Sequence, residues 1–206
     1  MKLFVKIILG LVGVIVVMAV AAWVYFGSGE EIYPEGLSVG AVAPTFEGED
    51  QYGNLVNLAN LTAEGDVVLV FFRGTWCPTC NQHIAALQDS LKQLEEKGAF
   101  VVAITPEKPE FLGENDFKTS VDIPVVYDQR LSIMNTYNVT YTMSLGSQRI
   151  FDVAGVDFNE LYGTSGKMPI PATYVIGSNG KIKYASAKDG GLEVTYSTVK
   201  ELLAVL

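Results

Sequence analysis

The chain has 206 residues, with 14 Lys or Arg against 23 Asp or Glu, which gives a formal net charge of −9. This acidic balance excludes a typical nucleic-acid-binding protein, because phosphates call for a basic surface. Two cysteines and one histidine are too few for a disulfide-stapled scaffold or a structural zinc site.

Residues 1–26 predict a membrane anchor. Residues 7–26 carry no charge, and a helix of this length spans about 30 Å, the hydrocarbon thickness of a bilayer. Lys2 and Lys6 precede this run and glutamates follow it. The positive-inside rule therefore predicts a single span with a cytoplasmic N-terminus and an extracytoplasmic remainder, in the bacterial periplasm or at the cell surface. A cleaved signal peptide is the alternative, although the apolar run exceeds a typical signal core.

The segments that follow predict a tether and then an α/β domain. Residues 27–39 are rich in Gly, Glu and Pro and are typical of a short tether. Residues 67–72 are unbroken in apolar character, which predicts a strand buried on both faces. Apolar residues at spacings of three and four predict a helix over 77–97. We predict the next strand at residues 99–105 and a loop with a short helix at residues 106–117.

The second half of the domain continues the alternation of strands and helices. Residues 123–127 predict a short strand and 129–137 a helix. Residues 139–168 show no clear period, so we interpret them as an insertion with one helical turn. A Gly/Asn turn within 173–186 predicts a hairpin, and 194–206 predict an amphipathic helix. The pattern as a whole indicates one α/β domain over residues 40–206, with a central sheet flanked by helices.

Both cysteines lie between the first buried strand and the long helix, as Cys77 and Cys80. At a helix start, unpaired N–H groups and the helix dipole stabilise a thiolate and lower the pKa of the first cysteine. Pro78 suits the first helical turn. A disulfide within four residues removes little chain entropy, so a redox role is favoured over a structural one. Half of a metal site and an inert disulfide are the alternatives, and His83 is expected on the helix surface.

Residues 168–173 contain a second candidate element, because a proline stands at the entry to a strand. The Ile170–Pro171 bond is a candidate cis peptide. If this bond is cis and faces the cysteines, the backbone around it can pair with an extended substrate that lies across the dithiol. The alternative is an ordinary loop proline.

Three motifs carry a resemblance to a known family. They are the segment GAVAPTF at 40–46, the motif RGTWCPTC at 73–80, and the proline, strand and hairpin block at 170–182. Over nearly all of residues 37–206 the chain resembles a thioredoxin-fold redoxin of the alkyl hydroperoxide reductase/thiol-specific antioxidant (peroxiredoxin-like) family. The resemblance implies a central mixed sheet, Cys77 as the attacking thiol and Pro171 as a cis-proline facing it.

Two departures from that family bear on the activity. Peroxiredoxins typically carry Thr three residues before the reactive Cys, where this chain has Gly74, and Arg where it has Pro171. Arg73 is a candidate for the missing thiolate-stabilising charge. The reactive centre thus resembles that of thioredoxins, including the membrane-tethered thioredoxin-like reductases that act outside bacterial cells.

Three functions follow as hypotheses. In a membrane-tethered thiol–disulfide oxidoreductase, Cys77 attacks a disulfide in a partner protein and Cys80 resolves the mixed disulfide. In a thiol peroxidase, a hydroperoxide oxidises Cys77 to a sulfenic acid and Cys80 condenses with it. The third hypothesis is a redox-inert binding domain. We favour disulfide exchange, in which the cysteine pair is the redox group without cofactor or metal, and a thiol reductant restores it.

The substrate surface is expected to surround the dithiol and the proline segment: Trp76, Pro78, Thr79, Ile170 and Pro171. The insertion at 139–168, with Arg149, Phe151, Phe158 and Tyr162, is expected to shape this groove or a partner surface. A solvated loop packed by its own aromatic residues is the alternative.

Overall fold

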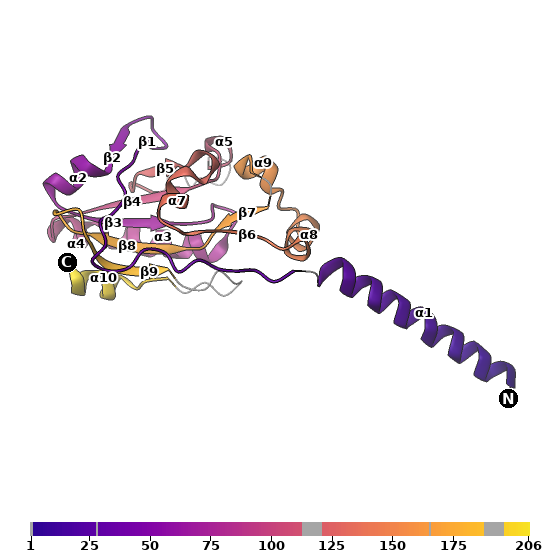
Figure 1. The fold of residues 1–206 in the computed structure, drawn as a ribbon. Helices are drawn as coiled ribbons and strands as arrows, with labels where there is room; N and C mark the ends of the chain where they lie inside the picture. The colour runs from indigo at the N-terminus through magenta and orange to yellow at the C-terminus, as the bar shows by residue number, and fades with distance from the viewer. Residues whose placement is uncertain (1, 28, 113–120, 165, 188–195) are drawn as a thin grey trace.

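A five-stranded mixed sheet forms the centre of the domain in the computed structural model, which describes residues 2–27, 29–112, 121–164, 166–187 and 196–206. Its strand order is β5-β4-β3-β8-β9 (Figure 1). The strands are β3 (Asp66–Phe71), β4 (Ala99–Thr105), β5 (Val125–Tyr127), β8 (Ala172–Ile176) and β9 (Ile182–Ala187). Strands β3, β4 and β5 run parallel to one another, β8 runs antiparallel to β3, and β9 runs antiparallel to β8. The expected thioredoxin-like arrangement of a mixed sheet flanked by helices is confirmed.

The central strand β3 is buried on both faces, as its unbroken apolar sequence predicts. Val67, Leu69 and Phe71 point into one hydrophobic core. Val68 and Val70 point into a second core on the opposite face. Because both cores close over β3, its carboxyl end is held rigidly, and the segment that leaves it carries the cysteines.

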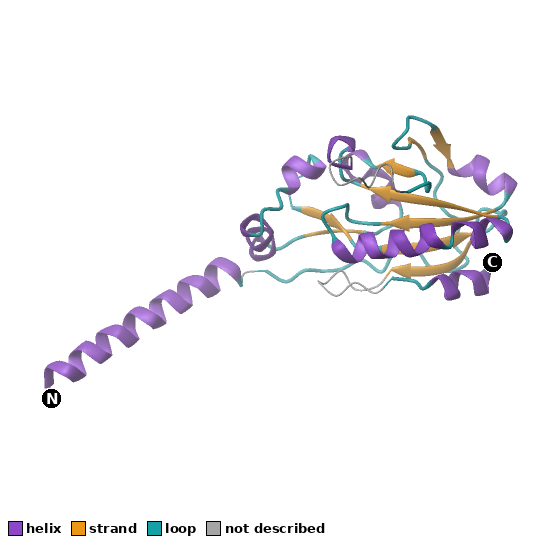
Figure 2. Cartoon of the chain, turned by 180° about the vertical axis from the view of Figure 1, so that it is seen from behind, coloured by secondary structure: helices purple, strands orange, loops and turns teal. Residues whose placement is uncertain are grey.

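Helices α3 (Pro78–Asp89) and α4 (Leu91–Glu96) replace the single helix expected over 77–97. Ser90 has φ −108° and ψ 5°, so the helix breaks there while the buried leucines on either side remain in the core. Figure 2 shows these helices lying along one face of the sheet. Helix α10 (Val199–Val205) covers the same face and begins at a capping box of Thr198 and Glu201. Residues 194–195 of the helix expected there lie outside the described residues.

The helix expected over 129–137 is also divided, into η1 (Gln129–Leu131) and α7 (Ser132–Thr136). Arg130 and Leu131 have positive φ angles of 59° and 60°. The Asp128 carboxylate accepts hydrogen bonds from the N–H groups of the residues that open α7, at 2.8 Å each. This carboxylate starts a new helix where the period alone predicts a continuous one. Helix α5 (Pro109–Leu112) lies within the expected 106–117 segment, of which 113–117 lie outside the described residues.

The insertion at 139–168 is far more regular than expected, and the prediction of one helical turn is wrong. It contains β6 (Thr140–Thr142), α8 (Leu145–Val153), α9 (Phe158–Tyr162) and β7 (Lys167–Pro169). Strands β6 and β7 pair antiparallel. The Ser144 side chain caps α8 and the Asp157 side chain caps α9, which stabilises helices too short for a clear period.

The N-terminal helix α1 (Lys2–Phe26) projects from the domain (Figure 1). Its segment Lys6–Phe26 is long and apolar enough to cross a membrane, as the sequence predicts. After it the chain runs along the domain, where Tyr33 and Leu37 pack against the core. Strands β1 (Glu47–Glu49) and β2 (Leu55–Asn57) form a small antiparallel sheet, followed by α2 (Leu58–Glu64).

Candidate active site

The two cysteines lie at the start of α3, beyond the carboxyl end of β3. Cys77 is the N-cap residue and Pro78 occupies the first helical turn. Both cysteines are free thiols, and 4% of Cys77 but none of Cys80 is exposed. Both cysteines are therefore buried, and Cys77 is the one that retains some exposed surface.

The environment separates the pKa values of the two thiols. A hydrogen bond from the Cys80 thiol is the largest cause that lowers the pKa of Cys77, to about 6, against the opposing effect of burial. The Thr79 hydroxyl, 3.4 Å from Cys77 Sγ, and the positive charge of Arg73 lower it further. Burial, followed by the interactions with Cys77, raises the pKa of Cys80. At neutral pH the pair therefore consists of a nucleophilic thiolate and a protonated thiol.

Arg73 points into the site, a direction that the sequence left open. Its side chain is buried, with 4% exposed, and Nε donates to the Pro169 carbonyl at 3.4 Å. The guanidinium therefore joins the loop before Cys77 to the strand that leads into the Ile170–Pro171 segment. This placement supports the proposed role of Arg73 as a stabiliser of the Cys77 thiolate.

Glu107 is a buried carboxylate beside the dithiol loop that the sequence analysis missed. It accepts hydrogen bonds from the Thr75 N–H at 2.7 Å and the Thr75 hydroxyl at 3.0 Å. Gly74 has φ +138°, and a Cβ there would lie 2.9 Å from Glu107 Oε2. The carboxylate thus fills the space of a side chain at the position where peroxiredoxins typically carry Thr. A signal existed, because Glu107 follows β4 and the carboxyl ends of parallel neighbours share one edge of a sheet.

The insertion forms a wall of the site through Trp76. This indole packs edge-to-face on Phe151 and Phe158, with ring centroids 5.7 and 5.4 Å away. Trp76 Nε1 donates to Tyr162 Oη at 3.0 Å, and Tyr162 Oη donates to the Arg73 carbonyl at 2.6 Å. The aromatic residues of the insertion therefore hold the loop that precedes Cys77, in line with the expectation that the insertion shapes the site.

On the opposite side of the pair, Tyr196 contacts the second cysteine. Its hydroxyl donates to Cys80 Sγ at 2.8 Å. His83 stacks on the Tyr196 ring at 4.2 Å, and its Nε2 lies 3.2 Å from the Ser197 carbonyl oxygen. The prediction that His83 lies on the helix surface is wrong, because the segment before α10 covers it. Burial lowers the pKa of His83 to about 4, so the ring is neutral at physiological pH.

The proline segment differs from the expectation in one respect. The Ile170–Pro171 peptide is trans, since the described residues contain no cis peptide. The Ile170 N–H donates to the Val139 carbonyl at 2.8 Å, so the chain passes from β7 to β8 in the ordinary trans form that X-Pro bonds favour. Of the expected substrate-binding residues, Pro78 and Thr79 are exposed, Trp76 is half-buried, and Ile170 and Pro171 are buried.

A dithiol with one activated and one protected thiol, at a helix start on a thioredoxin-like fold, defines a thiol-dependent redox protein. The chain belongs to the AhpC/TSA family, whose sequence profile matches residues 39–185. The predicted family and the predicted class of enzyme, a thiol-dependent oxidoreductase, are thereby confirmed.

A curated relative agrees with this assignment, and solved structures share the fold. The chain is 29% identical over 106 residues to a thiol-disulfide oxidoreductase ResA of Bacillus cereus, covering 51% of this chain and 60% of that protein. Its fold resembles the peroxidoxin BcpB of Mycobacterium tuberculosis (TM-score 0.57, 22% identity, 73% of this chain and 86% of that one). It also resembles a putative thiol:disulfide interchange protein DsbE of Chlorobium tepidum (TM-score 0.51, 19% identity, 82% and 98%).

Proposed function

We propose that this protein is a membrane-tethered thiol–disulfide oxidoreductase that acts on disulfides in partner proteins. The observation that carries the proposal is the asymmetry of the pair, with a lowered pKa at Cys77 and a raised pKa at the buried Cys80. Such a pair has one nucleophile ready to attack and a second thiol held back until the first has reacted. The similarity to ResA supports the same activity.

The reaction proceeds in two exchange steps. The Cys77 thiolate attacks one sulfur of the partner disulfide, the S–S bond breaks, and the departing sulfur leaves as a thiolate that takes up a proton. Cys80 then loses its proton and attacks Cys77 Sγ, which releases the second partner sulfur. Two electrons pass to the partner, which leaves as a dithiol, and the Cys77–Cys80 disulfide remains. A thiol reductant reverses these steps and restores the dithiol without any bound cofactor.

Forming the mixed disulfide itself prepares Cys80 for the second step. Besides burial, the hydrogen bond to the Cys77 thiolate and the negative charge of that thiolate raise the pKa of Cys80. Once Cys77 is bonded to the partner, that charge is gone. The Tyr196 hydroxyl, which already donates to Cys80 Sγ, then stabilises the developing thiolate.

The partner is proposed to approach over the exposed surface of Pro78 and Thr79, beside the half-buried indole of Trp76. Ile170 is fully buried and its N–H donates to the Val139 carbonyl, and Pro171 is buried as well. Their proposed role is therefore to support this surface from behind.

The domain is proposed to lie outside the cytoplasmic membrane of a bacterium, in the periplasm or at the cell surface. Lys2 and Lys6 precede the apolar span, whereas glutamates follow it, which favours a cytoplasmic N-terminus. Helix α1 is the proposed anchor.

The test compares two oxidants with the reduced full-length protein in detergent micelles, and Cys77→Ser serves as the control. Trp76 reports the oxidation in a stopped-flow fluorescence experiment. Rapid oxidation by a protein disulfide that depends on Cys77, together with oxidation by hydrogen peroxide no faster than that of free cysteine, is the expected result. Rapid Cys77-dependent oxidation by peroxide would instead make the protein a peroxidase.

A further inference from the structure

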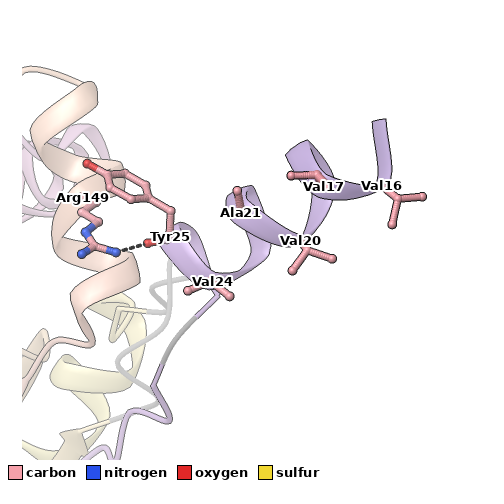
Figure 3. Close-up of a pocket in the computed structure, with 7 residues that line it drawn as sticks. All are labelled: Val16, Val17, Val20, Ala21, Val24, Tyr25 and Arg149. Carbon is pink, nitrogen blue, oxygen red and sulfur yellow. Dashed lines mark hydrogen bonds between the residues drawn. The ribbon is translucent and has the colours of Figure 1, made fainter. Parts of the chain in front are cut away.

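Helix α8 lies against the end of α1, at the level where the proposed membrane anchor leaves the bilayer. Gly146 packs against the Phe26 carbonyl with no room for a side chain. Arg149 donates to the Tyr25 carbonyl, and its guanidinium lies 4.0 Å from the centroid of the Tyr25 ring (Figure 3). Because Trp and Tyr residues favour the membrane–water interface, α8 stands at the height of that interface.

Three large apolar side chains of α8 are open to solvent. The exposed fractions are 61% for Leu145, 52% for Ile150 and 78% for Val153. At 3.6 residues per turn they share one side of the helix with Gly146 and Arg149, the residues that contact α1. Exposed apolar side chains that cluster on one face of a short helix indicate a surface that contacts a membrane, a protein or a ligand.

The opposite face of α8 belongs to the redox domain. Phe151 packs on Trp76 there. Figures 1 and 2 show α8 nearly end-on while α1 is seen from the side, so the two helices cross at a steep angle. A helix that crosses a membrane span steeply lies along the plane of the bilayer, as interfacial amphipathic helices do.

The connection between α1 and the domain is held as well. The Glu31 carboxylate accepts from the Ser144 N–H at 2.8 Å and from the Tyr33 hydroxyl at 2.6 Å. Tyr33 in turn packs edge-to-face on Tyr141 at 4.7 Å. These contacts join the tether to the residue that caps α8, so α8 stays next to the bilayer that α1 enters.

From these observations we infer that α8 docks on the surface of the bilayer, with Leu145, Ile150 and Val153 inserted at the boundary of headgroups and acyl chains. The inference rests on the proposed anchoring by α1. A shallow concave surface, open to the outside, follows α1 from Val16 to Tyr25 and reaches Arg149 of α8 (Figure 3). An acyl chain that lies along α1 would contact these valines, with the Arg149 guanidinium near its headgroup. Lipid is therefore the occupant that matches both the apolar face and the cation.

Docking of α8 fixes the orientation of the active site. Trp76, the residue before Cys77, packs on Phe151 of α8, so docking would place one helix between the dithiol loop and the bilayer. The pair would then face partners whose disulfide lies close to the membrane surface.

The experiment uses the full chain in phosphatidylcholine nanodiscs, made with or without brominated acyl chains that quench tryptophan. Val153→Trp places a reporter on the proposed face, and Ile150→Trp provides a second position. Leu55→Trp is the matched control, since Leu55 is a similarly exposed apolar residue (68%) on β2, at the other end of the domain. The unsubstituted protein supplies the background from its own two tryptophans.

We expect a blue-shifted emission and a loss of intensity in brominated nanodiscs for Val153→Trp and Ile150→Trp, and neither change for Leu55→Trp. Quenching at both positions no greater than in the control would overturn docking, even while quenching of Trp23 shows that α1 is inserted. A blue shift without quenching that grows with protein concentration would also overturn it, in favour of a second copy on this face. If the unsubstituted protein stays out of the nanodiscs, the proposed anchor itself fails.

Discussion

Replacing Tyr196 by Phe tests how the buried cysteine is activated. The substitution removes one oxygen, the hydroxyl that lies 2.8 Å from Cys80 Sγ, and keeps the ring that stacks on His83. A hydrogen bond to a charged group contributes about 1.5–3 kcal/mol. Since each 1.4 kcal/mol corresponds to a factor of ten in rate, we expect resolution of the mixed disulfide by Cys80 to slow by roughly 10- to 150-fold. The first attack by Cys77 should change little.

The assay follows the mixed disulfide directly. Reduced protein is mixed with a protein disulfide and quenched with acid at increasing times. Free thiols are then alkylated, and the covalent adduct is separated on a non-reducing gel. Cys80→Ser marks complete trapping, because its mixed disulfide has no thiol to resolve it. Tyr196→Phe is expected to accumulate the adduct transiently.

The matched control is Tyr184→Phe, which removes a hydroxyl that donates to Ser197 Oγ at 3.1 Å in the same region. It should resolve the adduct at the rate of the unsubstituted protein. Equal resolution rates in Tyr196→Phe and the unsubstituted protein would refute the role assigned to the Tyr196 hydroxyl. Slowing by both substitutions would show that the effect comes from loosening the segment before α10.

Four further predictions follow from the site. The rate at which iodoacetamide alkylates Cys77 should rise with pH to a plateau with a midpoint near 6. Cys80→Ala should move the midpoint upward, because it removes the hydrogen-bond donor that is the largest cause of the lowered pKa of Cys77. The pKa of Cys77 in the folded protein lies below the ordinary thiol pKa, so ionisation of this thiol adds to the unfolding free energy of the reduced protein. This contribution is complete above the ordinary thiol pKa and is lost as the pH falls through about 6. Chemical denaturation of the reduced protein across this pH range measures the change. Gly74→Ala, with a Cβ 2.9 Å from Glu107 Oε2 and φ +138°, should cost about 1–3 kcal/mol of unfolding free energy in urea titrations, and an unchanged midpoint would contradict the close approach. Phe158→Ala, at a position only 5% exposed, should cost about 3–5 kcal/mol by the same measurement, whereas a loss below about 1 kcal/mol would mean that the insertion does not pack on the site.

The sequence predicts best those segments in which the same requirement, burial of apolar side chains, applies to consecutive residues. Strand β4 (Ala99–Thr105) matches its predicted range, and β3 differs by one residue at each end. Both strands lie between two hydrophobic cores, so nearly all of their residues are apolar. The position of the dithiol was predictable for the same reason, because a short motif directly after a buried strand must lie close to the end of that strand.

The helices of the insertion could not be predicted from hydrophobic periodicity, because each of them depends on a single capping side chain. Ser144 and Asp157 each cap a short helix, and a helix of five to nine residues shows too few turns for its apolar positions to repeat. Phe151 and Phe158 would look the same in the sequence of a solvated loop. What makes them part of the site is their contact with Trp76, which is distant from both of them along the chain.

The two cysteines also differ in how much of their chemistry the motif itself contains. Thr79 and the helix start act on Cys77 from within the motif, so the sequence already predicts a lowered pKa there. Cys80 is governed by burial and by Tyr196, 116 positions away, and Glu107 approaches the loop from the next parallel strand. A chain with the same motif but another residue in place of Tyr196 would keep the first nucleophile and change the second step. The speed of disulfide exchange at this site is therefore set in part by residues outside the motif.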